Sequence, residues 1–130
     1  MARSYHVGLV SLALNVDIKW LDNLLSHYAI EGTHAGRRGV ARQLGQSAVE
    51  LVAVVRTLAV DLGLSVAESV RLAPILLSRG ATDIGQIQLR IDVSRLRAEL
   101  AQNLEEAMGL FEPARRGRPP KSSADGRRPA

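Results

Sequence analysis

Arginine residues gathered in two places carry the clearest chemistry in this chain. Glycines accompany the arginines in both places, so the backbone there can approach a partner closely. Arginines placed in this way can neutralise the phosphates of a nucleic acid and release its counterions. The two clusters are Arg37, Arg38 and Arg42, and Arg116, Gly117 and Arg118, the latter within the segment RRGRPPK. The pattern indicates nucleic acid as a partner.

The positive charge of the chain is concentrated near its C-terminal end. The chain has 130 residues, a net charge of +4 and a pI of about 10.3. Residues 113–130 contain six Lys or Arg and one Asp, a net +5, which leaves −1 for residues 1–112. A nearly neutral domain can still bind DNA where its basic groups cluster. A neutral domain with a solvated basic loop and a solubilising tail is the alternative.

Other kinds of chemistry have little support. The chain has no cysteine, which excludes disulfides and thiol catalysis. His6, His27 and His34 show no metal-ligand spacing, and no nucleophile, base and acid series or phosphate loop is present, so we expect no metal, no cofactor and no enzyme. No apolar run reaches the roughly 18 residues of a membrane span, and no signal-peptide pattern begins the chain. We therefore expect a cytoplasmic protein.

The first part of the chain predicts a helix, a turn and a second helix. Residues 5–14 form one helix, and Asp17 caps a second one over residues 17–28. The core side of the second helix is expected to hold Leu21, Leu24, Leu25 and Tyr28. Its outer side then carries Lys19, Asn23, Ser26 and His27.

A basic hairpin and two helices are expected next. Residues 30–44 contain three glycines around the first arginine cluster, which is typical of a hairpin with a positive tip. Ser47 with Glu50, and Ser65 with Glu68, match the capping box at the start of a helix. These helices are expected to run to Gly63 and to Gly80.

The end of the chain predicts a strand, a helix and a tail. Residues 86–93 alternate apolar and polar side chains, as a half-buried strand does, and Ser94 can cap a helix with a leucine stripe. A single strand needs another edge, from the basic hairpin or a second copy, and the stripe suits a partner helix, so we favour a homodimer. The alternative is that both elements fold back on their own domain. Residues 113–130 are expected to be disordered.

Residues 5–77 resemble the MerR-like winged helix-turn-helix domain. The matching segments are VGLVSLALNVDIKWLDNLL, HAGRRGVARQL and LVAVVRTLAVDLGLSVAESV. The resemblance implies that the helix of residues 17–28 enters the major groove of double-stranded DNA, while the hairpin contacts phosphates or the minor groove. The candidate base contacts are Lys19, Asn23 and His27, and the candidate phosphate contacts are Arg37, Arg38 and Arg42. Asp22 and Glu31 place negative charge beside this footprint.

The segment RRGRPPK resembles an AT-hook. Glycine between Arg116 and Arg118 lets an extended backbone enter a narrow A·T minor groove, and the following proline keeps the chain extended. A general electrostatic tether is the alternative for this tail. Either would raise the local concentration of the domain at DNA.

The sequence thus predicts a mainly α-helical winged helix-turn-helix protein with a small β wing, one extra strand, a C-terminal helix and a basic tail. We divide it into a DNA-binding domain (1–80), a dimerisation strand and helix (81–112) and the tail (113–130). The expected function is a bacterial transcriptional regulator in the nucleoid, without a small-molecule effector. The alternatives are an architectural or excisionase-like DNA binder, and a protein-interaction adaptor or antitoxin-like protein.

Overall fold

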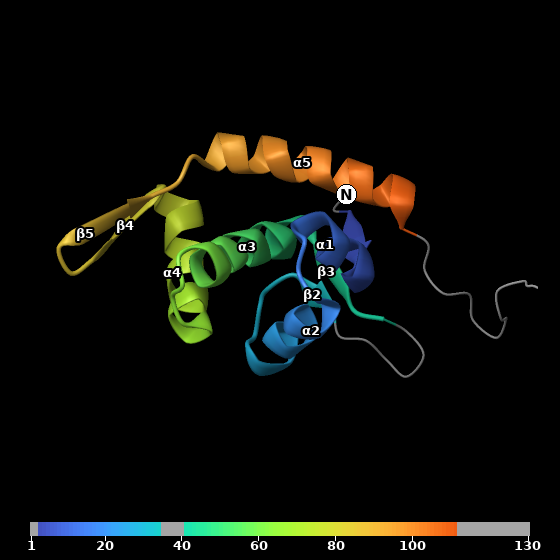
Figure 1. The fold of residues 1–130 in the computed structure, drawn as a ribbon, viewed down its shortest axis with the longest axis horizontal. Helices are drawn as coiled ribbons and strands as arrows, with labels where there is room; N and C mark the ends of the chain where they lie inside the picture. The colour runs from blue at the N-terminus through green and yellow to red at the C-terminus, as the bar shows by residue number, and fades with distance from the viewer. Residues whose placement is uncertain (1–2, 35–40, 112–130) are drawn as a thin grey trace, which may run out of the picture.

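The protein is mainly helical and has two small antiparallel sheets (Figure 1). A computed structural model describes residues 3–34 and 41–111. Its elements, in order, are β1 (Ser4–His6), α1 (Val7–Leu14), α2 (Ile18–His27), β2 (Thr33–His34), β3 (Gln43–Gly45), α3 (Gln46–Arg56), the π-helical turn η1 (Thr57–Asp61), α4 (Val66–Arg79), β4 (Ala81–Ile84), β5 (Ile87–Arg90) and α5 (Val93–Leu110).

Local side-chain caps set the boundaries of α1 and α2. The Nδ1 atom of His6 accepts the backbone N–H of Gly8 at 2.9 Å at the start of α1. Asn15 then turns the chain with a left-handed φ of 56°. The carboxylate of Asp17 accepts the N–H of Lys19 at 2.8 Å, which confirms the expected cap of α2. The expected first helix was too long, because residues 4–6 form strand β1.

The N-terminal strand completes a three-stranded sheet in the order β1-β3-β2. Leu44 lies opposite both Tyr5 and Thr33 in this sheet, and it is fully buried. Strands β2 and β3 confirm the strands of the expected hairpin at residues 30–44. Its tip, residues 35–40, lies outside the described residues.

The start of α3 corrects the first expected capping box. The helix begins directly after β3, with Gly45 as its N-cap and no side-chain cap. Glu50 is instead buried at 8% exposure, where its carboxylate accepts hydrogen bonds from Gln46 Nε2 (3.1 Å) and Arg97 Nε (3.3 Å). The carboxylate therefore links α3 to α5 and caps nothing.

Helix α4 confirms half of the second capping box. The hydroxyl of Ser65 accepts the N–H of Glu68 at 3.1 Å, as expected. The carboxylate of Glu68 binds Arg71, one turn further along, and does not return to Ser65. Gly63 and Gly80 have φ values of 78° and 79°, which fits their expected places after helix ends.

The strand expected at residues 86–93 pairs with a strand that the sequence pattern does not mark. Strand β5 pairs with β4, and Ile84 faces Ile87 beside the turn at Gly85. Strand β4 therefore supplies this edge in place of the expected wing hairpin, and pairing with a second copy stays a prediction. The strand is also shorter than expected, and its hairpin extends beyond the helical body (Figure 1).

Helix α5 folds back on its own chain. It lies along α1 and α3 (Figure 1), and Leu100, Leu104 and Ala107 of its stripe are 4% exposed or less. Its N-cap is Asp92, whose carboxylate accepts the N–H of Arg95 at 3.0 Å, so the expected cap at Ser94 is wrong. The leucine stripe thus has an intramolecular partner, which was the alternative to a partner helix.

Over residues 3–34 and 41–111, no helix is both long enough and apolar enough to cross a membrane.

Candidate nucleic-acid interface

Helix α2 carries an exposed row of polar side chains. Leu21 and Leu24 are buried beneath it, at 0% and 3% exposure. Lys19, Asn23 and His27 are all exposed and recur every fourth residue, so they lie along one side of the helix. The structure thus brings the three candidate base contacts together on one surface.

A hydrogen bond fixes the orientation of one of these side chains. The Nδ1 atom of His27 lies 2.8 Å from the backbone carbonyl oxygen of Asn23. Because a carbonyl oxygen can only accept, Nδ1 carries the proton and donates it. The other ring nitrogen, Nε2, is then available to a ligand. Among the described residues, the carboxamide of Asn23 makes no hydrogen bond and can use both its donor and its acceptor.

Beside this row lies a hollow of about 260 Å³. Trp20 of α2, Tyr28 directly after it and Val66 of α4 line it together with Asn23 and His27. Trp20 is half-buried and packs against the core. Two members of the polar row, Asn23 and His27, thus border an aromatic-lined hollow.

Arg42 is held against α2 by three hydrogen bonds. Its Nη1 donates to the backbone oxygen of Asp22 at 3.1 Å and to the Asp22 carboxylate at 3.4 Å, and its Nη2 donates to Ser26 Oγ at 2.9 Å. Arg42 directly precedes β3, so these bonds tie the second strand of the hairpin to α2. They also pair the charge of Asp22, which lies beside the expected footprint.

The hydrogen bonds of Arg42 to α2 limit its expected role as a phosphate contact. Its side chain is only 28% exposed, whereas a phosphate contact needs an accessible guanidinium. To bind phosphate, the guanidinium would first give up contacts with α2. Ser26 and Asp22 thus belong to the interface through Arg42, at separations of 16 and 20 residues that no local sequence pattern marks.

Five of the candidate residues fall outside the described parts of the chain. They are Arg37, Arg38, Arg116, Gly117 and Arg118. Strands β2 and β3 pair with each other, with Thr33 and His34 opposite Leu44 and Gln43. In the sequence, residues 35–40 connect these two strands. Arg37 and Arg38 thus belong to the chain that connects two neighbouring strands.

The other two histidines, His6 and His34, belong to strands of the three-stranded sheet. His6 caps α1, and its ring lies 5.0 Å from the ring of Phe111 at the end of α5. His34 is exposed in β2. In the described ranges, no group of three or more His, Cys, Asp or Glu side chains could hold a metal ion.

Comparison of the chain with protein-family models, with curated proteins and with solved structures gave no match. The resemblance to MerR-like domains stays a prediction.

Proposed function

We propose that this protein binds double-stranded DNA and regulates transcription as a MerR-like winged helix-turn-helix protein. The observation that carries the proposal is the exposed row of Lys19, Asn23 and His27 on α2, above buried leucines. Helix α2 is the recognition helix in this account. The hairpin that contains Arg37 and Arg38 is the wing.

The dimensions of α2 suit a DNA groove. Eight residues separate Lys19 from His27, which corresponds to about 12 Å along a helix. A helix fits the major groove, which is about 12 Å wide, and such a row spans roughly three base pairs. Asn23, at the centre of the row, has a carboxamide that can bond adenine bidentately. Lys19 and His27 are placed to contact guanine or phosphate on either side.

The wing supplies affinity in this proposal. Arg37 and Arg38 neutralise phosphates near the groove that α2 enters, and such contacts carry no sequence information. Arg42 fixes the angle between wing and helix through Asp22 and Ser26. The tail, with Arg116 and Arg118, adds contacts in the minor groove or with phosphates nearby.

A homodimer remains a prediction. The stripe of Leu100 and Leu104 cannot serve as the dimer contact while α5 packs on α1, so pairing of two copies would use another surface. Two copies on a two-fold axis would recognise a palindromic site, whereas one copy would recognise a short site without symmetry.

Selection of bound duplexes from random DNA tests the proposal. The full chain is compared with Arg37→Ala/Arg38→Ala and with a chain that ends at residue 112. Arg79→Ala/Arg90→Ala is the charge-matched control, because both arginines are exposed and lie in α4 and β5, at the hairpin end of the molecule. We expect one defined site whose binding survives the control and the truncation, and fails in the wing variant.

Two other results would contradict the proposed sequence-specific regulator and favour another function. Retention of A·T-rich DNA alone, lost on truncation, would favour an architectural binder that works through its tail. No retention of any DNA at low salt would favour a protein adaptor.

A further inference from the structure

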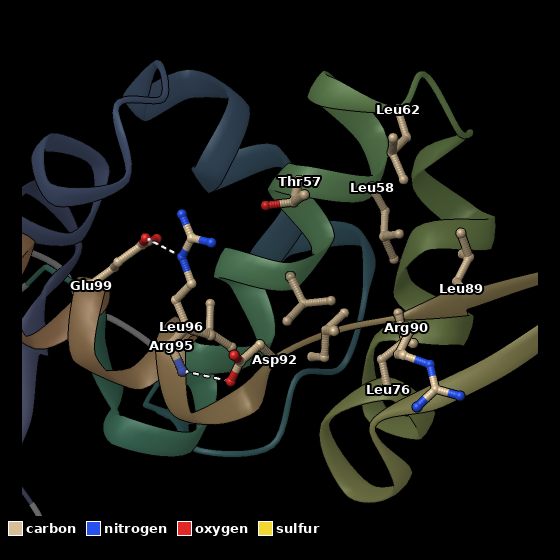
Figure 2. Close-up of a pocket in the computed structure, with 12 residues that line it drawn as sticks. Thr57, Leu58, Leu62, Leu76, Leu89, Arg90, Asp92, Arg95, Leu96 and Glu99 are labelled. Carbon is tan, nitrogen blue, oxygen red and sulfur yellow. Dashed lines mark hydrogen bonds and ion pairs between the residues drawn. The ribbon is translucent and has the colours of Figure 1, made fainter.

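A cavity of about 310 Å³ lies where the hairpin and α5 meet the helical body. Figure 2 shows leucine side chains from four elements around it. Leu58 and Leu62 come from η1 and the residue after it, Leu76 from α4, and Leu89 from β5, while Leu96 of α5 closes another side. The walls are thus built from chain segments that are far apart in the sequence.

The polar groups of the lining are already bonded within the chain. The hydroxyl of Thr57 donates to the carbonyl of Ala53 at 3.2 Å. Asp92 caps α5, and Nε of Arg95 donates to Glu99 at 2.9 Å (Figure 2). Arg90 donates to the side-chain oxygen of Gln88 at 3.2 Å, and the two acids and two arginines of the lining cancel in formal charge. The rest of the lining is mainly aliphatic.

The size of the cavity sets the size of its occupant. An engineered apolar cavity of about 150 Å³ accommodates benzene. A cavity of twice that volume suits two fused rings or a chain of about ten carbons. We propose that this cavity binds a neutral, apolar small molecule of that size.

The backbone beside the cavity supports this proposal. Helix α3 widens into a π-helical turn, where the N–H of Leu62 bonds the carbonyl of Thr57 at 3.1 Å. Such turns are rare and occur frequently at functional sites. Here the turn directs Leu58 into the core and leaves Leu62 57% exposed at the cavity. The sequence predicts no small-molecule effector, so a ligand in this cavity would correct that expectation and add a function to the proposed DNA binding.

The test uses a neutral dye, N-phenyl-1-naphthylamine, whose fluorescence rises in apolar surroundings, with the full chain. We expect saturable binding with one dye per chain and displacement by naphthalene. Leu62→Glu should weaken binding about tenfold or more, because an apolar ligand would desolvate the new carboxylate. Val60→Glu is the matched control, since Val60 lies two residues away, is 53% exposed and does not line the cavity. It should change the dissociation constant less than twofold.

Three results would overturn the proposal. One is the absence of saturable dye binding by a chain whose helical circular dichroism is intact. Another is equal loss of binding in both variants. The third is a dimer in sedimentation velocity that Leu62→Glu dissociates and Val60→Glu does not, which would make the cavity a contact between copies. None of these measurements depends on DNA, so they are independent of the proposed function.

Discussion

Replacement of Arg42 by alanine tests whether this residue positions the wing or binds phosphate. The change removes the bonds to Asp22 and to Ser26 and leaves the rest of α2 intact. A hydrogen bond to a charged group contributes about 1.5–3 kcal/mol, and an exposed ion pair about 0.2–1 kcal/mol. Because the arginine side chain is 28% exposed and that of Asp22 49%, we expect a loss of about 1–2 kcal/mol in the free energy of unfolding.

Thermal unfolding measures the loss of stability, and DNA titrations at several salt concentrations measure the change in affinity and in its salt dependence. A loss of that size lowers Tm by roughly 5–10 °C in a domain of about 100 residues. The affinity for the selected site should fall, yet the slope of log K against log salt between 50 and 200 mM should not change. A lost phosphate contact would reduce that slope by about 0.9.

Two variants serve as controls for Arg42→Ala. Arg38→Ala should reduce the salt slope by about 0.9 without lowering Tm, because Arg38 is expected to contact phosphate. Ser26→Ala removes only the Nη2 bond of Arg42 and should cost about 0.5–1 kcal/mol with the slope unchanged. A reduced slope with unchanged Tm in Arg42→Ala would show that Arg42 leaves α2 for phosphate, and would refute the positioning role.

Three further changes test the fold. Glu50→Gln should lower the free energy of unfolding in urea by about 1 kcal/mol, because it weakens the link from α3 to Arg97 of α5; no change would mean that this contact does not hold α5. Ser65→Ala should cost about 1 kcal/mol through loss of the α4 cap, and an unaltered midpoint would contradict that role. The hydrogen bond from Arg71 lowers the pKa of Glu68 below 4.5, so its contribution to stability is present above that pH and is lost as the pH falls through the lowered pKa. In Arg71→Gln, a carboxyl titration by NMR should place the pKa of Glu68 closer to 4.5, and an unmoved value would contradict this cause.

Elements whose boundaries depend on neighbouring residues were predictable from the sequence. Asp17 caps α2 because its carboxylate reaches a backbone N–H two residues away. Ser65 acts in the same way at α4, and Gly63 and Gly80 supply the positive φ values that end helical segments. Each of these signals acts within a few residues, so sequence alone contains it.

Features that depend on distant partners were not predictable. The box at Ser47 failed because Gly45 pairs with Ser4 in the sheet, and the helix begins directly at the end of that strand. The carboxylate of Glu50 is then used by Arg97, 47 residues away. Similarly, the partner of β5 is the short strand β4, whose four residues carry little alternation.

In the candidate interface, too, local features were predictable from the sequence and long-range contacts were not. The four-residue spacing of Lys19, Asn23 and His27 placed them on one face of α2 from the sequence alone, and the structure has them exposed there. The engagement of Arg42 with Asp22 and Ser26 required the fold, since the residues lie on different elements.

The central claim is that α2 reads base edges, and Asn23→Ala tests it most directly. Fluorescence anisotropy would give the affinities of the native chain and of Asn23→Ala for the selected duplex and for each single base-pair change in it. We predict a loss of about 1–3 kcal/mol on the selected duplex and a loss of discrimination at one A·T pair, with the other positions still read. An equal loss on every duplex, or no loss at all, would contradict the claim that α2 is the reader.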